Sequence, residues 1–368
     1  MNRYLFILNY LIDHMHNNDG FIRIDGSYGE GGGQILRTAV ALSIITSKPI
    51  EVSNIRAKRP NPGLRAQHVT AVNILADIFD AKVENARIGS STVRFIPSKS
   101  ISREHARVDI GTAGSITLVL QALIPAVSIS GNRLTIELIG GTDVRWSPSI
   151  DYVRYVLKQA YSMLGIRFDI EVKRRGYYPV GNGSVHVSIE PCSNLNSIEL
   201  VSAPRMEPSI VSICSNLPKH VADRQIAGAL VSLESNGIMC RSYSSSIEQS
   251  SSPGSSILVH AASDYGPFIG GDAVGERGKR AEDVGREAAM KFIKPYLSNA
   301  TVDPYLADMF VVPLSISSGV SKYIVNEVTM HLSTNLYIAS MITGCKYSIK
   351  EMSDNQYLVS IEPRASLV

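Results

Sequence analysis

Short apolar runs alternate along the chain with longer runs that have helical periodicity. Residues 21–25 predict a strand, residues 34–46 an apolar helix and residues 64–79 an amphipathic helix. Two further strand-like segments, AKVENARI and STVRFIP, are joined around Gly89. This alternation of strands and helices predicts an α/β (α+β) protein.

The order of these elements repeats. A strand–helix–strand–helix–strand–strand unit spans residues 21–100 and returns over residues 106–191. A third, partial copy runs from Asp303 to Pro363. We therefore expect repeated β-α-β-α-β-β modules that together form a large domain.

Within the second copy, the segment SPSIDYVRYVLKQAYSMLGI predicts a helix. Serine is a preferred N-cap residue and proline is favoured at the first helical position. We therefore expect this helix to begin with Ser147 as its N-cap and Pro148 as its first residue.

The order of predicted strands and helices differs from that of the repeated unit between Ser202 and about Ser298. The serine-rich stretch Ser242–Ser256 predicts a flexible loop. We expect residues 202–298 to form a smaller α/β domain inserted in the third module. Residues 20–201 and 299–368 would then form the large catalytic domain.

The first residues, 1–19, are interpreted as a leader ahead of the fold. Their apolar run, Tyr4–Ile12, is too short to span a bilayer. Only one positive residue precedes it and no small-residue cleavage site follows, so it does not resemble a signal peptide. We expect no membrane partner.

Charge and cysteine content narrow the function classes. Lys and Arg total 36 and Asp and Glu total 33, so the net charge is only +3. RNA binding would therefore depend on a local arginine cluster rather than on a basic surface. The four cysteines lie far apart with no CxxC pair, which argues against structural zinc and a disulfide framework and is typical of a reducing cytoplasm.

A glycine-rich segment, GSYGEGGGQILR, precedes the first predicted helix. Glycines let the backbone approach an anion, and free amides at a helix start favour phosphate. The segment lacks the Lys-Ser/Thr ending of a P-loop, so a simple tight turn is the alternative. Within it, Glu30 would repel a phosphate unless a cation intervened, which indicates a Mg²⁺ or Mn²⁺ ligand.

A second cluster of interest is basic. The segment IRAKRPNPGLRAQH is broken by two prolines and a glycine and contains four cations, Arg56, Lys58, Arg59 and Arg65. Guanidinium groups bind phosphate with two parallel hydrogen bonds. A solvated basic loop is the alternative, but the rigid breaks and an expected position near Arg37 favour an anion site.

A third candidate is His331, which precedes an apolar helix in the segment NEVTMHLSTNLYIAS. A single histidine is more often structural than catalytic. Seven other histidines, including His68 and His220, are equally open to a catalytic interpretation on residue type alone.

Several long segments in the same order resemble the RNA 3′-terminal phosphate cyclase family. They are DGSYGEGGGQILRTA, SNIRAKRPNPGLRAQHVTAV, GTAGSITLVLQALIPA, GGTD, RRGYYPVGNG, YLAD and HLSTN. The resemblance covers nearly the whole chain after Asp19. It implies repeated β-α-β-α-β-β modules with a smaller domain inserted in the last.

The resemblance also implies an ATP-dependent reaction on RNA 3′-phosphate ends. A histidine takes AMP from ATP, passes it to the RNA 3′-phosphate, and the vicinal 2′-OH then displaces AMP to close a 2′,3′-cyclic phosphodiester. The family's histidine corresponds to His331. Neutral imidazole, with an unperturbed pKa of about 6.5, is nucleophilic near neutral pH.

Other roles are carried over from the family position by position. The family's phosphate-binding residues correspond to Arg37, Arg56, Arg59 and Gln67. Its adenosine-binding residues correspond to Pro148, Tyr305 and Asp308, and its metal-binding glutamate corresponds to Glu30. One departure is Met309, because the family commonly has glutamine there and methionine removes a hydrogen bond to adenine.

The sequence leaves three alternative functions to consider. A catalytically inactive cyclase-like relative acts in ribosome assembly but lacks the nucleophilic histidine, so His331 and the arginines favour the active branch. An RNA-end-binding module would bind without consuming ATP. An enolpyruvyl transferase shares repeated α/β modules, but its substrate motifs are absent from this sequence.

Overall fold

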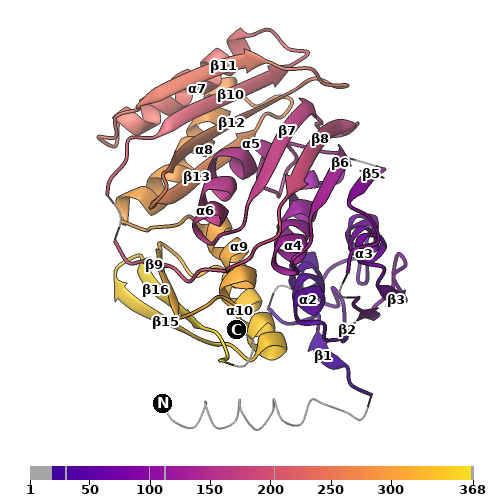
Figure 1. Cartoon of the computed structure of the whole chain (residues 1–368). Coiled ribbons are helices and arrows are strands. Elements are labelled where there is room, and N and C mark those ends of the chain that lie inside the picture. Colours follow the sequence, from indigo (N-terminus) through magenta and orange to yellow (C-terminus); the bar gives the residue numbers. More distant parts are fainter. Residues whose placement is uncertain (1–18, 30, 99, 112, 203, 366–368) are drawn as a thin grey trace.

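The computed structural model describes residues 19–29, 31–98, 100–111, 113–202 and 204–365. The expected leader lies outside these residues, apart from Asp19. Mixed helices and small sheets confirm the predicted α/β class (Figure 1). Within the described residues, the strands form four sheets of four strands each.

Three of these sheets belong to successive stretches of the chain. The first stretch contains β1 (Ile22–Asp25), α2 (Gly33–Thr46), β2 (Ile50–Ser53), α3 (Ala66–Phe79), β3 (Lys82–Glu84) and β4 (Val93–Ile96). The second contains β5 (His105–Asp109), α4 (Ile116–Ile129), β6 (Leu134–Gly140), α5 (Ile150–Tyr152), η1 (Val153–Leu157), α6 (Lys158–Met163), β7 (Phe168–Arg174) and β8 (Gly183–Ile189). The third contains β9 (Glu199–Leu200), α9 (Pro304–Leu314), β14 (Ser321–Val325), α10 (Met330–Thr343), β15 (Lys346–Ser353) and β16 (Gln356–Glu362).

These three sheets share one strand order. They run β1-β2-β4-β3, β5-β6-β8-β7 and β9-β14-β16-β15, so each has the order first, second, fourth, third. In each, the first pair is parallel and the other pairs are antiparallel. A parallel pair needs a crossover connection, and α2, α4 and α9 lie in these crossovers.

The fourth sheet lies in the crossover between β9 and β14. Its region contains β10 (Ser209–Ser215), α7 (His220–Glu234), β11 (Ser242–Ile247), β12 (Gly254–Ala262), β13 (Phe268–Val274) and α8 (Ala281–Leu297). A second hydrophobic cluster, which includes Val259 and Phe292, is formed entirely from this region. In Figure 1 the sheet lies at the top of the molecule, with α7 and α8 beside it.

The serine-rich stretch is not the flexible loop that its composition predicts. Residues 242–247 form strand β11, which pairs in parallel with β10, and β12 begins at Gly254. Backbone hydrogen bonds to a neighbouring strand do not depend on apolar side chains, and β11 lies at the edge of its sheet, where polar residues are tolerated.

The start of the helix that follows Pro148 also differs from the prediction. Its N-cap is Ser149, whose hydroxyl accepts a hydrogen bond from Tyr152 N at 3.3 Å, and helical residues begin at Ile150. Tertiary contact sets this boundary, because Ser149 N donates to the buried carboxylate of Asp272 in β13.

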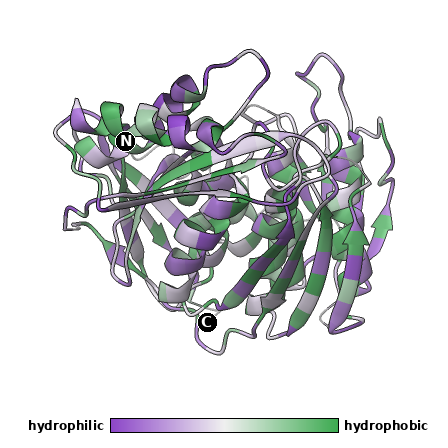
Figure 2. Ribbon diagram, turned by 90° about the horizontal axis from the view of Figure 1, so that it is seen from above, coloured by the Kyte–Doolittle hydropathy of each residue, from purple (hydrophilic) through white to green (hydrophobic). Residues whose placement is uncertain are grey.

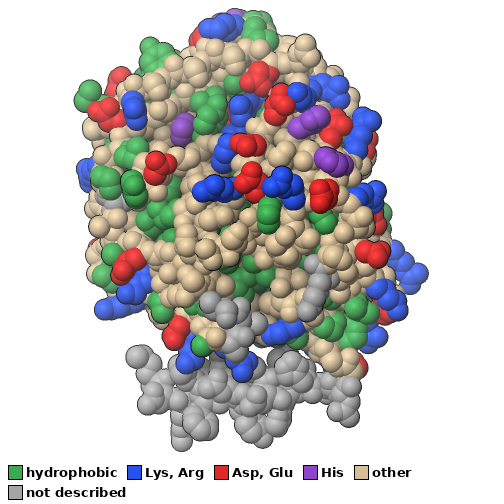
Figure 3. Space-filling model, viewed as in Figure 1, with side chains coloured by type: hydrophobic (Ala, Val, Ile, Leu, Met, Phe, Trp, Pro, Cys, Tyr) green, Lys and Arg blue, Asp and Glu red, His purple; other side chains and the backbone are tan. Residues whose placement is uncertain are grey.

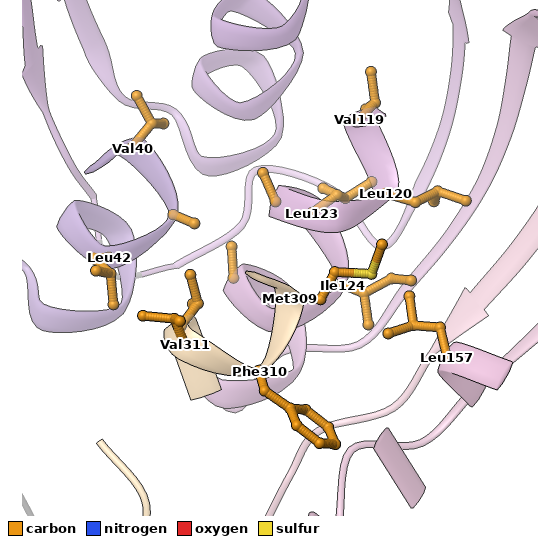
Figure 4. Packing of buried hydrophobic residues seen from close by; sticks show 14 of the residues in the cluster. Val40, Leu42, Val119, Leu120, Leu123, Ile124, Leu157, Met309, Phe310 and Val311 are labelled. Carbon is orange, nitrogen blue, oxygen red and sulfur yellow. The ribbon is translucent and has the colours of Figure 1, made fainter. Parts of the chain in front are cut away.

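The main core lies where the three crossover helices meet. Figure 4 shows Val40 of α2, Leu123 of α4 and Phe310 of α9 within one apolar cluster, and all three are fully buried. The strands that cover it alternate in burial, as Leu134 to Gly140 of β6 do. Figure 2 shows hydrophobic and hydrophilic residues alternating along several strands. These helices therefore have fixed positions relative to one another.

Helix α10 joins the other end of the chain to this core through α2. A buried hydrogen bond runs from Thr38 Oγ1 to Asn335 Oδ1 at 2.7 Å, and Gln34 Nε2 donates to the carbonyl oxygen of His331 at 2.9 Å. The side-chain amide of Asn335 also donates to the Asp308 carbonyl oxygen of α9 at 3.2 Å. One asparagine thus ties α2, α9 and α10 together.

The glycine-rich loop before α2 packs against the same helix. The ring of Tyr28 stacks on Tyr337 of α10 with centroids 4.1 Å apart. Gly29 has φ +57, and a Cβ there would lie 2.4 Å from Thr334 Oγ1. Glycine is required at this position both for its backbone conformation and for the close approach.

We expect Gly29→Ala to destabilise the protein more than Gly131→Ala. Both glycines have positive φ, but a Cβ at Gly131 meets nothing within 4 Å, so that variant reports the backbone cost alone, about 1 kcal/mol. The clash with Thr334 should add about 1–3 kcal/mol to the loss for Gly29→Ala. Urea denaturation of both variants measures this, and equal losses would contradict the close approach.

Candidate active site

A pocket opens where α2, α4, α9 and α10 meet the segment that precedes α5. Its lining combines apolar, aromatic and ionisable side chains. The residues are Gln34, Arg37, Thr38, Ala41, Leu118, Gln121, Ala122, Trp146, Pro148, Tyr305, Asp308, Met309, Val312, His331 and Asn335. Five of the residues singled out from the sequence therefore share one pocket: Arg37, Pro148, Tyr305, Asp308 and His331.

The helices that line this pocket do so with their first three turns. Gln34 and Arg37 lie at the start of α2, Tyr305 and Asp308 at the start of α9, and His331 at the start of α10. The N-terminal end of a helix carries a partial positive charge and unpaired N–H groups. The N-caps Asp303 and Thr329 already accept hydrogen bonds from the first amides of α9 and α10. At these two helices only the partial positive charge of the helix start therefore favours an anionic ligand such as a phosphate.

His331 is held beside a carboxylate. Its Nδ1 lies 3.3 Å from Asp308 Oδ2, and the His331 side chain is 50% exposed whereas that of Asp308 is 16% exposed. Thr329, the N-cap of α10, donates from Oγ1 to Asp308 Oδ1 at 3.3 Å. Burial raises the pKa of Asp308, and His331 opposes that shift. A carboxylate at Nδ1 favours the tautomer that carries its proton on Nδ1 and leaves Nε2 unprotonated.

Arg37 supplies positive charge to the same pocket. Burial lowers the pKa of its guanidinium to about 10, and Asp308 opposes the shift. The side chain therefore remains cationic at neutral pH. Arg37 also lines an adjoining pocket with Gln67 and His68 of α3, so the two pockets meet at this guanidinium.

Pro148 and Tyr305 form apolar parts of the His331 pocket. The Tyr305 ring packs edge-on against buried Tyr152, with centroids 5.7 Å apart. The N-cap of α9, Asp303, accepts hydrogen bonds from the N–H of Tyr305 and from the hydroxyl of Tyr152. Met309 lines the pocket while the bulk of its side chain packs in the core (Figure 4). Its thioether supplies no hydrogen-bond donor to a bound base.

Arg56 and Arg59 do not line the His331 pocket. Arg56 has φ +57, and its Nε is buried with no hydrogen-bond partner among the residues that the structure describes. Burial, followed by Arg59 and Arg65, lowers the pKa of Arg56. The Arg59 Nη2 lies 4.0 Å from where a Cβ on Gly32 would be, so this guanidinium borders the glycine-rich loop.

His68 is a residue whose role sequence reasoning left unassigned. Its Nδ1 accepts a hydrogen bond from Arg65 N at 3.1 Å, and a Cβ at Gly33 would lie 2.2 Å from its Nε2. Burial, then Arg37, Arg56 and Arg65, lowers its pKa to about 4. The ring is thus neutral at pH 7 and its Nε2–H faces the start of α2. The sequence signal for this contact was the spacing of three residues between Arg65 and His68 at the start of a predicted helix, which is typical of a capping box.

Cations gather here although the protein has little net charge. In Figure 3 acidic and basic side chains alternate across the visible face. By contrast, Arg37, Arg56 and Arg65 all act on His68, and within the described part of the chain no carboxylate forms an ion pair with any of these three. The concentration of positive charge is therefore local.

Three further observations concern a metal ligand and membrane crossing. Glu30, the expected metal ligand, lies outside the described residues. Among the described residues, no group of three or more His, Cys, Asp or Glu side chains could hold a metal ion. In the same part of the chain, no helix combines the length and apolar composition that crossing a membrane would require.

Comparison with known proteins identifies the family. Residues 28–349 match the family model described as RNA 3′-terminal phosphate cyclase. The chain belongs to the RNA 3′-terminal phosphate cyclase family. The predicted resemblance is confirmed, and the match contains every site residue carried over from the sequence.

Proteins named RNA 3′-terminal phosphate cyclase are similar over almost their full length. The one from Pyrobaculum neutrophilum is 43% identical over 342 residues, covering 93% of this chain and 98% of its own. Those from Thermococcus onnurineus and Methanopyrus kandleri are 45% and 41% identical, covering 89% and 93% of this chain and 95% and 99% of their own. A solved enolpyruvyl transferase, NikO from Streptomyces tendae, aligns at 10% identity with a TM-score of 0.34, covering 94% of this chain and 49% of its own; it is too distant to bear on function.

We expect His68→Asn to weaken the pH dependence of stability. The pKa of His68 falls from 6.5 to about 4 on folding, so the unfolded chain binds a proton first as the pH drops. The stabilisation is complete above pH 6.5 and is lost towards pH 4, which amounts to about 3 kcal/mol.

Urea denaturation at pH 7 and pH 4.5 measures this effect. His260, whose pKa burial also lowers to about 4, is present in both proteins, so the variant should keep part of the dependence. An unchanged difference between the two pH values would show that His68 is not held neutral by the fold.

Proposed function

We propose that this protein uses ATP to convert the 3′-terminal phosphate of RNA into a 2′,3′-cyclic phosphodiester. The observation that carries the proposal is the position of His331, in one pocket with Arg37 and Tyr305 and with Asp308 behind its Nδ1. Family membership and the names of the relatives support the same reaction.

In the first step, Nε2 of His331 attacks the α-phosphorus of ATP. A P–N bond forms, the bond to the bridging oxygen breaks, and pyrophosphate leaves. Because the imidazole gains positive charge as it attacks, the Asp308 carboxylate at 3.3 Å from Nδ1 stabilises the product. Asp308 acts through the ring and is a positioning residue.

In the second step, an oxygen of the RNA 3′-phosphate attacks the AMP phosphorus and the P–N bond breaks. The terminal phosphate then carries AMP as a good leaving group. In the third step, the adjacent 2′-OH attacks that phosphate, releases AMP and closes the ring. The RNA itself holds the hydroxyl beside the phosphorus, so the protein mainly neutralises charge.

The remaining residues divide between the two substrates. Pro148 and Tyr305 offer flat apolar faces for adenine. Arg37, Arg56, Arg59 and Gln67 bind phosphates. Glu30 would provide an oxygen ligand for Mg²⁺ or Mn²⁺, ions that commonly bind through one carboxylate and the phosphates of a substrate. Such an ion would offset phosphate charge.

The covalent step is tested with ATP labelled at the α-phosphate. We expect the wild-type protein to retain label after denaturation and His331→Ala to retain none, because the P–N bond requires the imidazole. His220→Ala removes an exposed histidine at the start of α7 and should label normally. An unlabelled wild-type protein would instead favour an RNA-end-binding module or an inactive cyclase-like protein.

Replacing Arg56 and Arg59 together with Ala should impair cyclisation more than self-adenylylation. Neither residue lines the His331 pocket; Arg59 borders the glycine-rich loop and acts electrostatically on Arg56, so we assign both to the RNA phosphate. Each charged hydrogen bond contributes about 1.5–3 kcal/mol, so we expect cyclisation to fall at least tenfold further than labelling.

Rates of covalent labelling and of cyclic-end formation are compared for this double variant. Arg133→Ala, which removes an exposed cation from the turn between α4 and β6, is the control and should affect both rates little. Equal losses in the two assays would contradict the assignment of these arginines to the RNA end.

A further inference from the structure

Trp146 is an aromatic residue at the His331 pocket to which the proposed reaction gives no role. It is the only tryptophan in the chain and is 85% exposed. It nevertheless lines the pocket, two residues before Pro148. A large apolar ring that borders a polar pocket and faces solvent indicates a binding surface.

The backbone at Trp146 is strained. Its φ of +67 lies in the left-handed region, which is unfavourable for a bulky aromatic residue. Such conformations persist where the surroundings enforce them, and they cluster at functional sites. The strain therefore marks Trp146 as a candidate for a functional role.

The loop that carries Trp146 is firmly anchored. Asp143 is fully buried and its carboxylate lies 3.3 Å from Nη1 of Arg175, which is itself fully buried. The N–H groups of Thr142 and Asp143 both donate to the Gly176 carbonyl oxygen. On the other side, Ser147 Oγ donates to the Val144 carbonyl oxygen at 3.0 Å. The ring is therefore presented by a rigid support despite its exposure.

A cation lies over the ring. The Arg145 guanidinium carbon is 5.0 Å from the Trp146 ring centroid, and Arg145 Nε lies 3.1 Å from Glu276 Oε1. The ion pair keeps the guanidinium over one indole face. An aromatic ring beside an arginine is the combination that binds single-stranded nucleic acid, through base stacking and phosphate contact.

We propose that Trp146 stacks on the base of the RNA's 3′-terminal nucleotide. This rests on the proposed function and deepens it. The interior of the pocket already offers Pro148 and Tyr305 to adenine, whereas Trp146 lies at the mouth, where an RNA chain must pass into solvent. Stacking on an indole accepts any base, so the contact fixes the terminal nucleotide without selecting its sequence.

Intrinsic fluorescence tests the contact directly, since all tryptophan emission comes from residue 146. The His331→Ala protein prevents turnover and is titrated separately with ATP and with short RNAs that end in a 3′-phosphate. We expect quenching by RNA whichever of the four bases is terminal, and little change with ATP. Quenching by ATP with none by RNA would assign the ring to the nucleotide and overturn the proposal.

Kinetics of two variants separate stacking from folding. Trp146→Gly removes the ring and also relieves the positive φ, so it should fold at least as well as the wild type. We expect its KM for RNA to rise about 5- to 150-fold, with a KM for ATP within about twofold of the wild-type value. Trp146→Phe should recover part of the RNA affinity.

Tyr243→Ala is the matched control. Tyr243 is 63% exposed on β11, at the far edge of the sheet whose opposite edge, β13, packs near α9. It should leave both KM values unchanged. An unaltered RNA KM in Trp146→Gly would overturn the stacking proposal while leaving the cyclase reaction intact. Absence of covalent AMP in the wild type would instead overturn the proposed function.

Discussion

The packing of α10 on α2 is the contact on which the site depends. These helices are almost 300 residues apart in sequence, yet Thr38 and Asn335 share a buried hydrogen bond of 2.7 Å. Buried polar groups are costly when unpaired, so this bond specifies one relative position of the helices. With it, His331 is set beside the glycine-rich loop, and Asn335 also binds the backbone of α9, from which Asp308 projects.

Positive charge at the site has two sources that act together. Helix starts contribute partial charges that cannot titrate. Arg37 contributes a full positive charge, because burial lowers the pKa of its guanidinium only to about 10. The neutral His68 adds a donor without adding repulsion among the neighbouring arginines. A nearly neutral protein can thus attract polyanionic substrates to one place, which is the distribution that an RNA-end enzyme needs.

Two predictions made from local composition were wrong at places where hydrogen bonds to distant segments set the structure. Serines at residues 242–247 favour a loop locally, but β10 provides a template whose backbone groups pair with them. The helix expected to start at Pro148 starts two residues later. The reason is that Ser149 N donates a hydrogen bond to the buried carboxylate of Asp272, more than 120 residues away in the sequence. In contrast, α2 was predicted to within one residue, because a continuous apolar run is a local property of the chain. His331 was expected ahead of an apolar helix and instead lies in the first turn of α10.

The sequence by itself determined the α/β class, the family, and which residue types are available for phosphoryl transfer, because periodicity and motif order are properties of the linear chain. Tertiary structure alone decided that His331, Asp308, Arg37 and Tyr305 share a pocket that Arg56 and Arg59 do not line. It also decided that His68 is neutral and that Trp146 faces solvent on a rigid loop. The distances between these side chains, their burial and the electrostatic field around them arise only when segments far apart in sequence pack together.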